Sequence, residues 1–266
     1  MTDWAATCRA AVADVQRVLL DLPTRVEREP VTGLGKGGDE TTAIDAEVER
    51  VVIALLDDRL DDYTIVSEEI GELVKGSGRP WLVLDPVDGS LNAKRGVPHF
   101  CLSLAVADGP TMNDVTFGYV YDFGTGEEWT ARRGEGAWLD GVALGAVKPK
   151  DEIELLAFEA TLTSSIAEKA SNVVGLAHRL RVMGSLALAL CNPAAGRIDG
   201  ACSLKGARSV DIAAAQLLVR EVGLSIDLFE APPFGTAPLD LEPRSRVVAA
   251  ANDALCARLA AALALP

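Results

Sequence analysis

A run of apolar residues, Trp81–Leu84, leads directly into segment 85–90, which reads DPVDGS. The run predicts a buried strand, so two carboxylates lie three residues apart where that strand ends. Pro86 fixes its own φ and has no N–H to satisfy, whereas Gly89 permits an unusual φ or a close approach of the backbone. A helical turn after Gly89 would direct N–H groups outward and attract an anion. Carboxylates beside an anion site require cations between them, which predicts Mg²⁺ bridging the protein and a phosphate group.

Taken alone, such a segment is more simply a turn with an Asx hydrogen bond and a solvated second aspartate. Two further features argue against that interpretation. Glu68 and Glu69 follow another predicted strand, Tyr63–Val66, and Asp211 lies in the first turn of an otherwise apolar helix over 209–222. Each has its own simple explanation, a solvated loop for the glutamates and a favourable helix dipole for Asp211. Together, the three groups favour a metal cluster assembled from remote carboxylates.

The charge balance restricts the partners of the chain. With 39 acidic and 25 basic residues the net charge is −14, and the field of the protein opposes binding to polyanions. We therefore expect no nucleic-acid partner. A small phosphorylated metabolite fits, because a divalent metal relieves the negative charge locally.

Cysteine use and hydropathy bear on the compartment. The five cysteines are scattered, no Cys-x-x-Cys pair exists and there are only two histidines, which disfavours zinc. Free thiols fit a reducing, cytoplasmic location. No apolar run reaches about 18 residues, so we expect no membrane span and no membrane partner. The first residues lack the basic and apolar pattern of a signal peptide.

The predicted elements divide the chain into two halves. In the first, residues 1–147, we expect an α+β half with helices over 3–21 and 41–59, loops over 30–39 and 71–80, and strands over 63–66, 81–84, 100–107, 115–122 and 127–132. In the second, residues 148–266, helices and strands alternate as in α/β proteins. Its strands are predicted over 155–159, 197–201, 224–228 and 246–250, and its helices over 164–174, 185–190, 209–222 and the C-terminal tail. We expect the two halves to pack as one body.

These motifs resemble the inositol monophosphatase and fructose-1,6-bisphosphatase superfamily. The matching pieces lie in family order: Lys36 with GDETTAID, the Ser-Glu-Glu at 67–69, WLVLDPVDGSLN, Gly184-Ser185 and VDIAAA at 210–215. The resemblance implies a layered α-β-α-β-α sandwich and a homodimer. It also implies a lithium-sensitive phosphomonoesterase that uses two or three Mg²⁺ ions. The first half would carry most metal ligands, and the second would carry Asp211 and the substrate contacts.

The resemblance also implies a role for each matching residue. Metal ligands would be Glu68, Asp85, the Val87 carbonyl, Asp88 and Asp211, with Asp85 shared and a weaker third ion near Glu68 and Glu69. A water held by Glu68 and Ser90 would attack phosphorus. Thr42 and Asp45 fall where the family has outer partners, although a solvated helix face explains them equally well. Contacts to phosphate or substrate are expected from Gly89, Ser90, Gly184, Ser185, Lys205 and Arg208.

Departures from the family pattern leave the substrate open. Leu204 stands where the inositol enzymes have an acidic residue that grips hydroxyls, and DGSLNA replaces DGTTNF. Lys205 and Arg208 could hold a second phosphate, as in a fructose-1,6-bisphosphatase, or could be ordinary surface charges. Inositol-1-phosphate is the leading substrate type; histidinol phosphate and 3′-phosphoadenosine nucleotides are less favoured. A non-catalytic family member is disfavoured because all four acidic side chains are present, and no EF-hand loop supports a calcium module.

Overall fold

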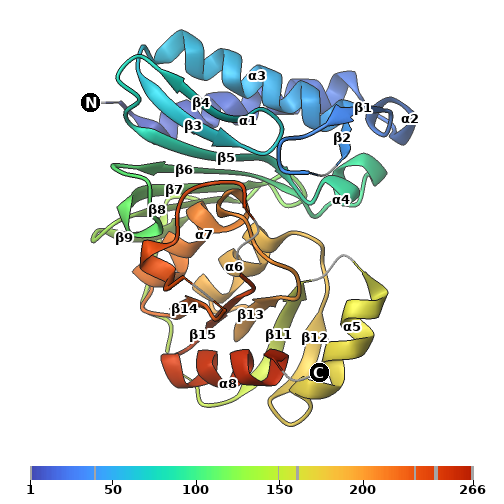
Figure 1. Ribbon diagram of the computed structural model, residues 1–266, viewed down its shortest axis with the longest axis vertical. Coiled ribbons are helices and arrows are strands. Elements are labelled where there is room, and N and C mark those ends of the chain that lie inside the picture. Colours follow the sequence, from blue (N-terminus) through green and yellow to red (C-terminus); the bar gives the residue numbers. More distant parts are fainter. Residues whose placement is uncertain are drawn as a thin grey trace.

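Two β-sheets alternate with three layers of helices in the computed structural model of the protein (Figure 1). The structure describes residues 2–38, 40–148, 150–159, 162–230, 232–242 and 245–264. The order of layers is helix, sheet, helix, sheet, helix, which confirms the predicted α-β-α-β-α sandwich. None of the described helices is long and apolar enough to cross a membrane.

The larger sheet has eight strands in the order β10-β9-β8-β7-β6-β5-β3-β4. These are β3 (Tyr63–Ser67), β4 (Gly71–Lys75), β5 (Trp81–Asp88), β6 (Cys101–Ala107), β7 (Val115–Asp122), β8 (Glu128–Arg132), β9 (Gly136–Leu139) and β10 (Val142–Leu144). Only β3 and β5 pair in parallel; the other neighbours are antiparallel. The outer face is covered by α1 (Trp4–Asp21) and α3 (Ala43–Arg59).

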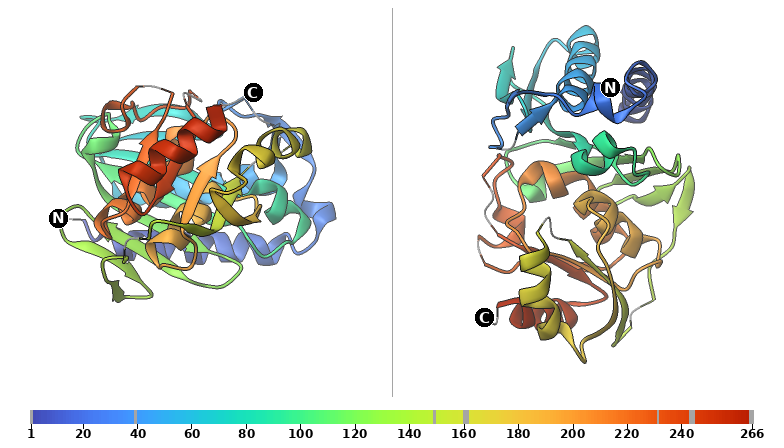
Figure 2. Two further views of the ribbon diagram at one scale, coloured as in Figure 1. Left: turned by 90° about the horizontal axis from the view of Figure 1, so that it is seen from below. Right: turned by 90° about the vertical axis from the view of Figure 1, so that its right-hand side faces the viewer.

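The smaller sheet has five strands in the order β12-β11-β13-β15-β14. They are β11 (Ile153–Glu159), β12 (Ala177–Arg181), β13 (Gly200–Ser203), β14 (Ser225–Leu228) and β15 (Val247–Ala250). Helices α5 (Thr163–Ala170) and α8 (Asp253–Ala264) lie outside this sheet (Figure 2, left). The last strand of the larger sheet ends at Leu144 and the first strand of the smaller one begins at Ile153, so the chain passes between the sheets near the predicted boundary. The division into two halves at residue 147, with their separate functions, stays a prediction.

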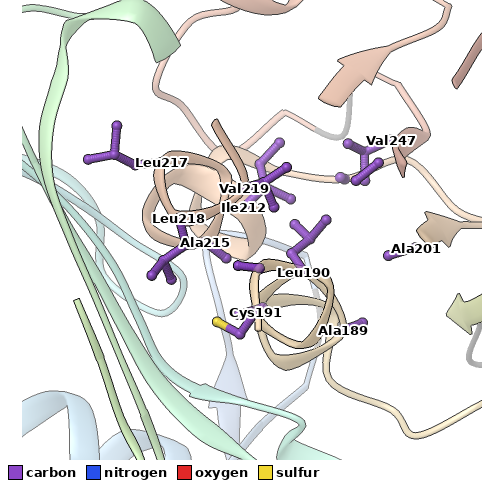
Figure 3. Packing of buried hydrophobic residues seen from close by; sticks show 14 of the residues in the cluster. Ala189, Leu190, Cys191, Ala201, Ile212, Ala215, Leu217, Leu218, Val219 and Val247 are labelled. Atoms are coloured by element: carbon purple, nitrogen blue, oxygen red, sulfur yellow. The ribbon is translucent and has the colours of Figure 1, made fainter. Parts of the chain in front are cut away.

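The middle layer consists of α6 (Leu186–Ala194) and α7 (Ser209–Glu221), which lie between the two sheets. A helix that contacts sheets on both sides must be apolar around its circumference. Helix α7 meets this requirement, because every residue from Ser209 to Val219 is buried. Side chains of the two helices meet in one cluster, where Leu190 and Cys191 lie beside Ala215 (Figure 3). Small alanines let the helices approach closely.

Shorter elements connect these layers. Helix α2 (Arg25–Arg28), the hairpin of β1 (Val31–Leu34) and β2 (Glu40–Thr42), and helix α4 (Ser90–Arg95) border the larger sheet, and single turns of 3₁₀-helix cover Met112–Asp114, Ser171–Val173 and Phe234–Thr236. Arg28 of α2 connects the end of α1 to α4, because its guanidinium donates to the carbonyls of Leu19, Leu22 and Ala93.

Two loop predictions are wrong. The predicted loop over 30–39 contains strand β1, and the predicted loop over 71–80 contains strand β4. Strands β9, β10 and β12 were not predicted at all. β4, β10 and β12 lie at sheet edges, β1 belongs to a separate two-stranded hairpin, and all four are largely solvent-exposed. An exposed strand needs no continuous apolar run, so sequence patterns do not reveal it.

We expect Gly118→Ala to destabilise the protein by about 1–3 kcal/mol, because a methyl group would overfill a packed contact. Gly118 lies in β7, where an added Cβ would be 2.5 Å from the carbonyl oxygen of Ala214 in α7. Urea unfolding measures the change. Gly145→Ala is the matched control, since a Cβ there meets no atom within 4 Å; equal effects of the two substitutions would contradict the close sheet–helix contact.

Candidate active site

An irregularity in β5 brings two aspartates to one cavity. Asp85 pairs with Ser103 and Asp88 with Cys101, so β5 advances three residues while β6 advances two. Residues three apart in a regular strand point to opposite faces, but the extra residue of a bulge reverses this alternation. Both aspartates therefore line the same cavity, and their exposed fractions are 2% for Asp85 and 9% for Asp88.

The cavity has a volume of about 350 Å³ and is unusually rich in carboxylates. Its walls come from both sheets and from α7. The acidic residues that line it are Glu40, Asp45, Glu68, Glu69, Asp85, Asp88, Glu159 and Asp211. The other predicted site residues at its wall are Val87, Gly89, Ser90, Gly184, Lys205 and Arg208. The structure thus brings together all the predicted metal ligands, while their binding of metal stays a prediction.

Arg208 lies among these carboxylates. Its Nη2 is 2.7 Å from Glu68 Oε1 and 3.1 Å from Asp211 Oδ1, and its exposed fraction is 7%. The backbone N–H of Arg208 donates to Asp211 Oδ2 at 2.7 Å, which is the backward half of a capping box at the start of α7. Arg208 is thus part of the buried ion-pair network, and its predicted contact with phosphate stays a prediction.

Burial and mutual repulsion act on the acidic groups. Burial raises the pKa of Glu68 to about 7, against the opposing charge of Arg208. Burial also raises the pKa of Asp88 to about 6, and burial together with the charges of Glu68 and Asp88 raises that of Asp85 well above its usual range. One guanidinium does not neutralise this set, so the site has a deficit of positive charge.

The donor set suits Mg²⁺, which prefers carboxylate and carbonyl oxygens. Asp45 lines the cavity, and its Oδ1 is buried and has no hydrogen-bond partner among the described residues. In the part of the chain that the structure describes, however, no group of three or more Asp, Glu, His or Cys side chains is already arranged to hold a metal ion.

Asp45 and Thr42 lie behind the site as one hydrogen-bonded unit. Asp45 Oδ2 accepts from the Thr42 N–H at 3.1 Å and from the Thr42 hydroxyl at 2.6 Å. Each residue is only 3% exposed, so the alternative of a solvated helix face is wrong. Ser90, at the start of α4, donates its hydroxyl to the Val87 carbonyl at 2.9 Å. Gly89 has φ +94°, a left-handed backbone conformation that favours glycine at this position.

Asp88 is held by the beginning of α6. Its Oδ2 accepts from the Ser185 hydroxyl at 2.6 Å and from the Ala187 N–H at 2.7 Å, and its Oδ1 accepts from the Leu186 N–H at 3.4 Å. Helix N-termini favour anions, so this position stabilises the charged form of Asp88. The predicted substrate contact of Ser185 stays a prediction, and the structure gives its hydroxyl a partner within the protein.

Sequence reasoning missed two buried carboxylates beside the site. Glu49, in α3, accepts hydrogen bonds from the Ser67 hydroxyl and the N–H of Glu69, and so holds the turn that carries Glu68. Glu159 lines the cavity at the end of β11, and burial raises its pKa to about 7. Glu49 lies four residues after Asp45 and therefore on the same helix face, a signal that could have revealed it.

The glycine-rich loop before β2 approaches the site through its backbone. The N–H groups of Lys36 and Gly37 donate to the carbonyls of Glu69 and Glu68. A Cβ on Gly37 would collide with the guanidinium of Arg208. Lys36 itself is exposed and is absent from the residues lining the cavity, so its side chain is not placed at the site.

The layered fold is that of a solved inositol monophosphatase–fructose 1,6-bisphosphatase structure. The chain belongs to the inositol monophosphatase family, whose sequence model matches residues 4–264. It is 31% identical over 231 residues to a fructose-1,6-bisphosphatase/inositol-1-monophosphatase of Methanothermobacter thermautotrophicus, which covers 83% of this chain and 82% of that protein. A protein of the same name from Archaeoglobus fulgidus is 31% identical over 256 residues, or 94% of each chain.

Other relatives carry a different name. The Nus factor SuhB of Escherichia coli is 36% identical over 194 residues, which cover 70% of each chain. Among solved structures, an inositol monophosphatase–fructose 1,6-bisphosphatase superimposes with a TM-score of 0.83 at 24% identity, covering 98% of this chain and 100% of that one. Extragenic suppressor protein SuhB from Bartonella henselae gives 0.81 at 23% identity, covering 99% of both chains. These structural likenesses show the fold.

In protein stripped of divalent metal, we expect the free energy of unfolding to fall as the pH rises. The folded-state pKa values of Glu68 and Asp88, about 7 and about 6, lie above the ordinary values of 4.5 and 3.8. Between these limits the folded state binds more protons than the unfolded state, so stability decreases by a few kcal/mol from about pH 5 to about pH 8. Urea unfolding in the presence of a chelator measures this, and constant or rising stability would contradict it.

Proposed function

We propose that the chain is a Mg²⁺-dependent phosphomonoesterase that hydrolyses a small sugar or polyol phosphate of the inositol-1-phosphate type. The observation that carries the proposal is the convergence of Glu68, Asp85, Asp88 and Asp211 on one cavity with a deficit of positive charge. The names of the archaeal relatives support the reaction class. A small phosphorylated metabolite is the matching partner, because the cavity is enclosed by both sheets and is of modest volume.

The residues that would hold Mg²⁺ are Glu68, Asp85, the Val87 carbonyl, Asp88 and Asp211. When bound, Mg²⁺ supplies positive charge that attracts phosphate and makes water more acidic. We propose two or three ions; their number follows the family resemblance. The homodimer, the cytoplasmic location and the sensitivity to lithium likewise stay predictions.

The remaining groups orient the reactants. Asp45 lines the cavity, and its Oδ2 accepts from the N–H and the hydroxyl of Thr42, which fixes the orientation of the carboxylate. Ser90 and Gly89 lie at the wall on the same side, where the hydroxyl and backbone N–H groups would donate to phosphate oxygens. Glu68 would hold the water from the other side.

A fructose-1,6-bisphosphatase is the alternative within the same reaction class. Lys205 is an exposed lysine at the wall of the cavity, and it is suited to a second phosphate because none of the described ion pairs uses it. The archaeal relatives are named for both activities. A screen of phosphate release from inositol, fructose, histidinol and 3′-phosphoadenosine phosphates with Mg²⁺ decides between these substrates.

A role without hydrolysis is the second candidate function, because several relatives are named Nus factor SuhB. Such a role would also revise the expectation that the chain has no nucleic-acid partner. Mg²⁺ binding without phosphate release from any ester in the screen would favour it.

We expect Asp88→Asn to reduce phosphate release by at least about a hundredfold, because it removes a ligand charge with little change of volume. Loss of metal binding, measured by calorimetry, should accompany the loss of activity. Asp227→Asn is the matched control, since Asp227 is exposed on β14 away from the cavity. Full activity of Asp88→Asn would remove Asp88 from the ligand set.

Substitution of Lys205 tests the bisphosphate alternative. We expect Lys205→Ala to lower kcat/KM for fructose-1,6-bisphosphate by about tenfold more than for a monophosphate, because only the former has a second phosphate to contact. Arg208→Ala should impair both substrates, since Arg208 pairs with Glu68 and Asp211. Lys148→Ala, an exposed lysine outside the cavity wall, is the control; equal losses on both substrates for Lys205→Ala would reject the alternative.

A further inference from the structure

The Met183–Gly184 turn is held from two sides by side chains to which the proposed function gives no role. Glu159 accepts from the Met183 N–H at 3.2 Å through Oε1 and from the Gly184 N–H at 2.8 Å through Oε2. Asn92 donates its Nδ2 to the carbonyls of Met183 at 2.7 Å and His99 at 2.8 Å. Glu159 ends a strand of the smaller sheet and Asn92 follows a strand of the larger one, so the turn is fixed to both.

Gly184 permits this close arrangement. Its φ is +87°, and a Cβ there would lie 3.1 Å from Asn92 Nδ2. The carbonyl oxygen of Gly184 lies 3.2 Å from the position that a Cβ on Gly89 would take. The turn therefore packs directly against the segment expected to hold phosphate.

The residue after the turn connects it to a predicted ligand. Ser185 donates its hydroxyl to Asp88, and the next two N–H groups, of Leu186 and Ala187, donate to the same carboxylate. A displacement of the turn would move all three donors at once, because they are consecutive along the chain. The position of the turn thus decides how the Asp88 carboxylate is oriented.

Glu159 is costly to bury, which indicates that its hydrogen bonds matter. Its exposed fraction is 5%, and no described ion pair compensates its charge. A buried carboxylate without a cation is stable only when its oxygens accept hydrogen bonds. The two N–H groups of the turn are the donors that the structure describes for the Glu159 side chain.

We propose that Glu159 and Asn92 are positioning residues: by fixing the Met183–Gly184 turn, they set Ser185 and the first N–H groups of α6 on Asp88 and so orient this carboxylate toward the cavity. The proposal rests on the proposed function for the identity of the ion that Asp88 would bind. The hydrogen-bonded chain from Glu159 to Asp88 is independent of that function.

The test compares Glu159→Gln with Glu154→Gln, a matched change on the same strand, where Glu154 pairs with Arg179 at the surface. A glutamine can accept at only one of its two terminal atoms, so one N–H of the turn loses its partner. In metal-free Glu159→Gln we expect amide hydrogen exchange of residues 184–188 to accelerate by about tenfold, and the Mg²⁺ dissociation constant from calorimetry to rise about 10–100-fold. Glu154→Gln should change neither.

A double variant separates positioning from general destabilisation. The loss of Mg²⁺ affinity in Glu159→Gln should not add to that in Asp88→Asn, because both act through one carboxylate. Unchanged exchange, or fully additive losses, would overturn the proposal. Asn92→Asp places an acceptor opposite two carbonyls and should accelerate amide hydrogen exchange of the same residues, 184–188. This variant provides the test if Glu159→Gln does not fold.

The outcomes also distinguish this proposal from the proposed function. If the unmodified protein binds Mg²⁺ but releases no phosphate from any ester, the proposed phosphatase function is rejected. The positioning role is then still tested by the amide exchange and by the Mg²⁺ dissociation constant. If it binds no Mg²⁺, the function fails and the exchange of residues 184–188 alone decides positioning.

Discussion

The gathering of buried carboxylates around one cavity is the constraint on which the site depends. Buried carboxylates repel one another strongly because little water screens them. The chain offsets this with donors supplied by its own backbone: the Val87 N–H on Asp85, the start of α6 on Asp88, and the Arg208 N–H on Asp211. Asp85, Asp88 and Asp211 thus each have a backbone donor within the protein. The guanidinium of Arg208 adds the cation that joins the two halves of the cluster.

The sandwich explains how residues so remote in sequence meet. Strand β5 and helix α7 lie on facing layers, so the ends of both open onto the same space between the sheets. Helix α7 packs against five strands of the larger sheet, β5 to β9, and Gly118 lets it approach closely. The geometry of the site therefore depends on the packing of α7 against the larger sheet as much as on the polar groups at its rim.

Residue patterns predicted the carboxylate cluster, and the family resemblance implied the layers. Predictions failed where the determining interaction is not local. The residue types of the DPVDGS segment predict a metal and phosphate site. Asp211 was predicted because it is an aspartate in the first turn of an otherwise apolar helix. Glu159 carries no such signal, and Glu49 is marked only by its spacing of four residues after Asp45. In sequence, a glutamate that accepts backbone N–H groups from another segment resembles an exposed one. The prediction of a loop at β4 failed for a related reason: the strand is fixed by its pairing with β3 rather than by its own exposed residues.

The hydrogen bonds of Asp88 span a long stretch of chain, since its donors follow it by 97 to 99 residues. Contacts of such sequence separation form late, after much of the chain has been ordered. During synthesis, Asp88 emerges well before the start of α6, whose donors hold its carboxylate. Until the chain has been synthesised as far as α6, the Asp88 carboxylate therefore lacks these donors, and water is its alternative hydrogen-bond partner.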